Sequence, residues 1–229
     1  MIFDPLYVIR IAPALLLAMW AQGKVHNAHA RASRIRASSG MSGAQTAQRI
    51  LSAHGINNVR VEMTRGFLGD HYDSRKKALR LSPDVYNGNS LASVGIAAHE
   101  VGHAIQDRTG YAALKLRNGI VPLAGIGSNF AFFIFLAGML LQISGLVLVA
   151  IVLFASVVVF QLINLPVEYN ASSRARKVLV ANGVIAPSEE PAVARVLDAA
   201  AWTYVAATIS AVLTLLYFLM RSGLLGRRD

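Results

Sequence analysis

The chain has 229 residues, of which 55% are hydrophobic and only 15% are charged. A soluble protein has about 25% charged residues, so this composition excludes a disordered chain and argues against a freely soluble monomer. The sequence has no cysteine, which excludes disulfides and thiolate metal ligands. The formal net charge is +10, and the distribution of that charge must decide between a nucleic-acid partner and a membrane.

Two tracts contain no Asp, Glu, Lys or Arg, namely residues 118–167 and 199–220. A spanning helix needs about 20 apolar residues, so the first tract is long enough for two spans. The polar and flexible residues at 142–145 indicate the turn between them. The second tract carries aromatic residues near its ends, as at a headgroup boundary. Together the tracts predict three membrane-spanning helices.

The segment from Pro5 to Gly23 is a weaker candidate for a span, because it contains Arg10. Its alternative is a cleaved signal peptide with an apolar core at 11–20 and a small-residue cleavage pattern at 28–30. The basic residues that follow the apolar core favour a retained anchor, since positive charge after a span holds that side in the cytoplasm. The sequence therefore predicts about four transmembrane helices.

With four spans, the segments 24–117 and 167–198 fall on the same side of the bilayer. That side carries most of the basic residues near the span ends, which predicts that it is cytoplasmic. A lipid bilayer flanked by these basic residues therefore accounts for the net charge, and a nucleic-acid partner is not needed to explain it. The sequence also has no nucleic-acid-binding motif. The basic residues on this side are Lys24, Arg31, Arg34, Arg36, Arg108, Lys115, Arg117, Arg174, Arg176, Lys177 and Arg195.

The polar segment 24–117 has the pattern of a small α+β unit. A capping box at 42–45 opens a helix that Gly55 ends. Alternation predicts a strand at 59–63, and residues 78–81 are a second short strand candidate after a loop at 64–77. A second helix is predicted from Ser90 to Gln106.

The second helix contains His99-Glu100-Val101-Gly102-His103. Histidines at i and i+4 project from the same helix face, close enough to share one metal ion. Glu100 lies beside them, where it can accept a proton from water at the metal. The alternative is a pair of surface histidines, but the small residues around them suit a packed helix, where polar groups need partners.

A catalytic zinc site requires a third protein ligand. Glu168 directly follows the third span and returns to the side of His99. From the pattern alone, a carboxylate that caps a helix N-terminus is an equal alternative. Asp107 is a weaker candidate, and Arg174 could pair with Glu168, steady an oxyanion or flank the membrane.

The chain resembles the YugP-like membrane zinc metallopeptidases of bacteria over nearly its whole length. These are in turn similar to gluzincins of the Ste24/HtpX type. The zinc motif alone is shared by many unrelated proteases, so the combination of matching segments carries the resemblance. The matching segments are Phe3–Pro5, Ser39–Ala44, Asp70–Asp73, Leu81–Tyr86, Ala98–Gln106 and Leu165–Ser172.

The resemblance implies that His99, His103 and Glu168 bind one Zn²⁺ per chain, with Glu100 as general base. Iron, cobalt or manganese suit the same ligands. Ste24/HtpX-type enzymes usually have Asp four residues after the ligand glutamate, where this chain has Ser172. Either Ser172 or another group, such as Asp107 or a carboxylate from 70–84, then orients the imidazole.

The resemblance further implies a polypeptide substrate held along a sheet edge at the strand 78–81, with His71 or Tyr72 as an oxyanion donor. We thus expect a mainly α, multi-pass protein of the bacterial plasma membrane, with a small zincin-like α+β catalytic unit on its cytoplasmic face. A non-catalytic metal-binding or scaffolding protein is the alternative. No pattern sets the oligomeric state. The expected segments are 1–23, 24–117, 118–166, 167–198, 199–220 and 221–229.

Overall fold

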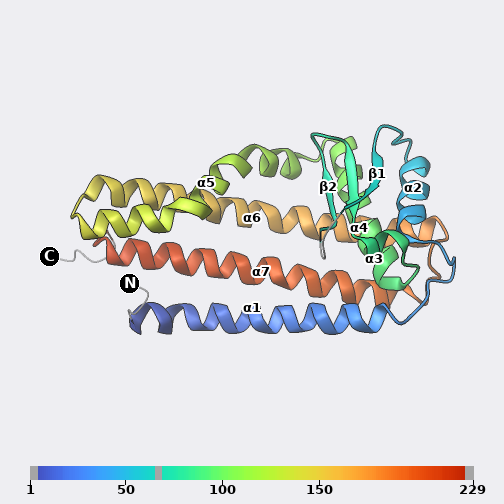
Figure 1. Ribbon diagram of the computed structural model, residues 1–229, viewed down its shortest axis with the longest axis horizontal. Helices are drawn as coiled ribbons and strands as arrows, with labels where there is room; N and C mark the ends of the chain where they lie inside the picture. The colour runs from blue at the N-terminus through green and yellow to red at the C-terminus, as the bar shows by residue number, and fades with distance from the viewer. Residues whose placement is uncertain (1–4, 65–68, 225–229) are drawn as a thin grey trace. The chain divides into compact units, whose positions relative to one another are not determined.

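The computed structural model describes residues 5–64 and 69–224, which separate into two compact units. The site unit comprises 22–114 and 166–202, and the apolar unit comprises 1–21, 115–165 and 203–229. Four long helices contribute residues to both units (Figure 1). These helices are α1 (Pro5–Ala32), α5 (Ala112–Leu140), α6 (Ser144–Ala181) and α7 (Glu190–Arg221).

Three helices in the described part of the chain are long and apolar enough to cross a membrane: α5, α6 and α7. They contain the three spans that the charge-free tracts predict, and the turn expected at 142–145 overlaps the break between α5 and α6 at 141–143. The expected first span lies in α1, although residues 1–4 fall outside the described part. A fourth span therefore stays a prediction.

Large aromatic side chains form the core of the apolar unit. Phe135 of α5 stacks on Phe218 of α7, with ring centroids 4.1 Å apart and an interplanar angle of 6°. Tyr217 and Phe218 are almost completely buried, as are Phe135 and Ala150. Such contacts hold α5, α6 and α7 together through packing rather than through charge.

The site unit contains a three-stranded sheet with the order β1-β3-β2. The strands are β1 (Arg60–Met63), β2 (His71–Asp73) and β3 (Ala78–Leu81). β1 is parallel to β3, and β2 is antiparallel to it. The strands predicted at 59–63 and 78–81 are confirmed.

Two expectations about this sheet are wrong. Residues 64–77 are not only a loop, because they include β2. The strand at 78–81 is not a sheet edge, because β3 pairs on both sides. β2 has only three residues, too few for alternation to show, and its turn is held by the Asp73 carboxylate, which accepts hydrogen bonds from the backbone of Arg75 and Lys76.

Three further helices complete the site unit: α2 (Gly43–Ala53), α3 (Pro83–Asn87) and α4 (Leu91–Arg108). The predicted capping box is present, since Ser42 and Gln45 each bond the backbone of the other. α4 packs against α2, α3 and the sheet, and Val94, Ala97 and Val101 are fully buried. The helix that carries the two histidines is thus the centre of this core.

α6 is continuous from Ser144 to Ala181, through Pro166. The alternative that Glu168 caps a helix N-terminus is therefore wrong, because Glu168 lies inside α6. Proline is tolerated inside long apolar helices when neighbouring groups satisfy the backbone that it leaves free. As a consequence, an apolar helix and the segment that bears Glu168 form one element.

Candidate metal centre

α4 brings His99 and His103 onto one face, one helical turn apart. Its first turn is fixed by Ser90, whose hydroxyl accepts a hydrogen bond from the backbone of Ser93 at 3.1 Å. The two imidazole rings meet edge to face, with centroids 4.9 Å apart. The i, i+4 spacing therefore places both rings beside a common point.

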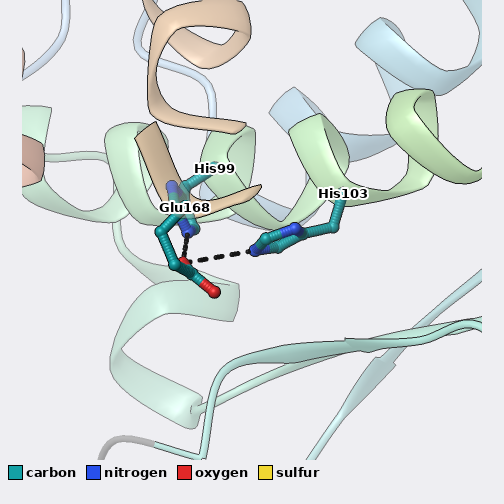
Figure 2. Close-up of side chains that lie close together, drawn as sticks. All are labelled: His99, His103 and Glu168. Atoms are coloured by element: carbon teal, nitrogen blue, oxygen red, sulfur yellow. Dashed lines mark hydrogen bonds and ion pairs between the residues drawn. The ribbon is translucent and has the colours of Figure 1, made fainter. Parts of the chain in front are cut away.

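Glu168 reaches the same point from α6 (Figure 2). Its Oε2 atom lies 3.2 Å from Nε2 of His99 and 3.6 Å from Nε2 of His103. Glu168 and His103 are buried, with 3% and 7% of their surfaces exposed. The structure thus brings together the two histidines and the third candidate ligand.

Gly102 allows α4 and α6 to approach this closely. A Cβ atom at Gly102 would lie 2.6 Å from the backbone oxygen of Ala171. No side chain fits there without moving one helix, so a residue between the two histidines sets the distance from α4 to the Glu168 side chain.

Each imidazole has a second partner on its Nδ1 atom. Nδ1 of His99 lies 3.1 Å from the Ser172 hydroxyl, and Nδ1 of His103 lies 3.0 Å from Oε1 of Gln106. The Ser172 contact corresponds to one of the two alternatives left by the sequence. Gln106 was not among the predicted site residues, although its position one turn after His103 puts it on the same helix face.

The contacts of Gln106 determine which nitrogen of His103 carries a proton. The Gln106 Nε2 group donates to the backbone oxygen of Val167 at 2.8 Å and to Oδ1 of Asn170 at 3.0 Å. Oε1 of Gln106 therefore faces His103, and because it can only accept, Nδ1 of His103 must donate. Nε2 is the nitrogen that faces Glu168, so it is the one available to a metal ion.

Arg174 supports this arrangement from α6. Its Nε group donates to Oδ1 of Asn170 at 2.7 Å, the same oxygen that accepts a hydrogen bond from Gln106. Arg174 thus positions Asn170, and Asn170 in turn positions the Gln106 side chain. Among the described residues, the Arg174 side chain pairs with Asn170 and not with Glu168.

The carboxylate of Glu100 has a different environment. Only 8% of Glu100 is exposed, yet within residues 5–64 and 69–224 its side chain takes part in no protein hydrogen bond or ion pair. The residue is buried as a whole, but its carboxylate oxygens are not among the described side-chain atoms that are buried without a partner, so they reach open space. Glu100 is free to interact with water or with a ligand.

The negative charges of Glu100 and Glu168 both act on the His103 imidazole. Burial alone lowers the pKa of this imidazole, but the hydrogen bond to Glu168 and the negative charges of Glu100 and Glu168 outweigh burial and raise the pKa. The position between the rings and Glu168 is therefore electrostatically suited to a cation.

The donor atoms fit a zinc ion. One nitrogen from each histidine and one oxygen from Glu168 all lie within 4.8 Å of one another. A tetrahedral ion with bonds of about 2.1 Å separates its ligand atoms by about 3.4 Å, close to the 3.2 and 3.6 Å between Oε2 of Glu168 and the two Nε2 atoms. Two imidazoles and one carboxylate leave a fourth position for water or substrate.

The remaining predicted residues lie elsewhere in the site unit. The Tyr72 hydroxyl donates to Asp107 at 2.6 Å, and Lys77 also pairs with Asp107. Burial and this hydrogen bond raise the pKa of Tyr72, so its proton stays committed to Asp107. His71 is exposed, and its ring contacts the Gly69 backbone and Arg80. Asp107 therefore orients Tyr72, whereas Gln106 contacts the imidazole of His103.

A His₂Glu donor set on two packed helices defines a class of metal centre found in zinc peptidases. Residues 7–223 match the model of a family described as "putative neutral zinc metallopeptidase". The chain is also 47% identical over 215 residues to a protein of Bacillus subtilis (strain 168) named "Putative membrane protease YugP", and the alignment covers 94% of this chain and 96% of that protein. No solved structure matches. The chain belongs to this zinc metallopeptidase family.

Proposed function

We propose that the protein is a zinc-dependent endopeptidase of the bacterial plasma membrane. The observation that carries the proposal is the convergence of His99, His103 and Glu168 beside the buried Glu100, which has no protein partner among the described residues. In a structural zinc site four protein ligands fill every position of the metal. Here the residues provide three ligands, which leaves one position open, and a carboxylate that can act as a base.

Zinc held by these residues would supply a Lewis acid and make water nucleophilic near neutral pH. Glu100 accepts a proton from the water that adds to the peptide carbonyl and returns it to the departing amine. Gln106 keeps His103 in the tautomer whose Nε2 faces the centre. Ser172 holds the His99 ring from its outer side.

The substrate we propose is an extended polypeptide paired with β2. β2 is an outer strand of the sheet and packs on α4, the helix that bears the two histidines. Backbone groups on an edge strand can bind an extended chain through main-chain hydrogen bonds. β1 is the other outer strand, but the contacts of α4 with the sheet run mainly through β2 and β3. This placement replaces the expectation that β3 forms the edge.

The test is hydrolysis of a peptide library by zinc-loaded protein and by Glu100→Gln. We expect Glu100→Gln to lower the rate by at least about 10²-fold, because it removes the proton acceptor, while one zinc per chain is retained. Glu62→Gln, on the partly exposed strand β1, removes a carboxylate that pairs only with Arg60 and Arg80 among the described residues; it is the control and should keep full activity. Full activity of Glu100→Gln would remove this residue as base, and a zinc-loaded wild type that cleaves no peptide would favour a non-catalytic metal-binding protein.

A further inference from the structure

A cavity of about 620 Å³ lies in the site unit, away from the metal centre. Its lining residues come from the last turns of α1, from Ile35 and from the first turns of α7. These two helix segments lie side by side in Figure 1. None of the predicted ligands, and neither Glu100 nor Gln106, lines it. The proposed peptidase chemistry therefore leaves this cavity without a role.

Basic side chains dominate the polar lining of the cavity. Lys24 and Arg31 of α1 line it together with Arg195 of α7, and Asp198 is the only acidic residue among the described residues of the lining. Lys24 places its Nζ atom 5.6 Å from the centre of the Trp202 ring. The cavity thus has a net positive charge and an aromatic wall.

The position of the cavity along α7 indicates its ligand. From residue 203 to residue 220, directly after Trp202, α7 contains no charged residue and belongs to a helix apolar enough to span a membrane. Tryptophan is enriched at the headgroup level of a bilayer, and basic pockets between helices at that level bind phosphate headgroups. Arginine guanidinium groups match phosphate oxygens with two parallel hydrogen bonds.

The geometry points to a binding site for the phosphodiester headgroup of an anionic glycerophospholipid, held by Arg31, Arg195 and Lys24 beside Trp202. The apolar part of α7, which begins directly after Trp202, favours a lipid over free phosphate, because only a lipid has acyl chains that can lie along it. The site binds a lipid without reaction, so its role is separate from the proposed peptidase activity.

The test uses full-length, delipidated protein in detergent and native mass spectrometry with dioleoylphosphatidylglycerol. We expect one tightly retained lipid per chain, and an affinity about ten-fold weaker or more in Arg31→Gln/Arg195→Gln. Arg34→Gln/Arg75→Gln is the control, since it removes the same charge from exposed positions outside the cavity. This control should bind the lipid as the wild type does.

Two further ligands separate the possible sources of binding. Dioleoylglycerol, which lacks the phosphate, should bind at least ten-fold more weakly, and inorganic phosphate at millimolar concentration should not displace the lipid. Equal affinity for dioleoylglycerol, displacement by phosphate, or equal losses in the two double variants would each overturn the proposal. Zinc content, measured in the same samples, reports on the metal centre independently.

Discussion

At the scale of single residues, Gln106 combines two roles that are usually separate. Its amide NH₂ group binds the backbone of α6 at Val167, and its carbonyl oxygen binds Nδ1 of His103. The same side chain thus joins the two helices and fixes an imidazole tautomer. Gln106 is fully buried, so solvent does not compete for these bonds.

We predict that Gln106→Leu weakens zinc binding by about 10–100-fold, because a nearly equal volume is kept while the acceptor for His103 Nδ1 is lost. Competition with a chromophoric chelator measures this affinity without a substrate. Gln48→Leu, at an exposed position of α2, is the control and should bind zinc as the wild type does. An unchanged affinity in Gln106→Leu would show that the amide does not position His103.

The residue pattern was sufficient to predict His99, Glu100 and His103, because spacing along one helix directly determines a shared face. Glu168 and Ser172 lie about seventy residues away, and only the resemblance to a family raised Glu168 above its alternative. Gln106 was missed because glutamine has no characteristic chemistry, and its role depends on a backbone oxygen in another helix. The metal-binding and catalytic roles of all these residues stay predictions.

At the scale of elements, the candidate metal centre lies where α4 crosses α6. The capping box, strand alternation and charge-free tracts are local signals, so α2, β1, β3 and the three long apolar helices α5, α6 and α7 could be predicted from the sequence. The order of the strands and the continuity of α6 through Pro166 depend on contacts between distant segments, which periodicity does not encode. β2 was missed for the same reason, since pairing with β3 defines it.

Gly102→Ala tests the close approach of α4 and α6. The added methyl group would overlap the Ala171 carbonyl, so we expect destabilisation of about 1–3 kcal/mol, a lower Tm and loss of bound zinc. Thermal unfolding in detergent and metal analysis measure both effects. Gly23→Ala in α1 has open space around the new methyl group and should leave Tm unchanged or raise it. A Gly102→Ala protein with the Tm and zinc content of the wild type would contradict the account of this crossing.

At the scale of the whole molecule, the distribution of basic residues predicts that the metal centre faces the cytoplasm. The absence of native cysteine makes this testable with single-cysteine variants in intact cells. Arg75→Cys, in the turn between β2 and β3, should react with a membrane-impermeant maleimide only after the cells are broken. Ser144→Cys, at the start of α6, should react in intact cells, and the reverse pattern would invert the predicted topology.

The central claim is that His99, His103 and Glu168 hold one zinc ion, and zinc content per chain tests it most directly. Elemental analysis of purified protein of known concentration should give one zinc per chain for the wild type and for Glu100→Gln. Glu168→Ala and His99→Ala should each give far less than one after dialysis against a weak chelator, because each removes one of three protein ligands. A full equivalent of zinc retained by Glu168→Ala, at wild-type affinity, would contradict the account.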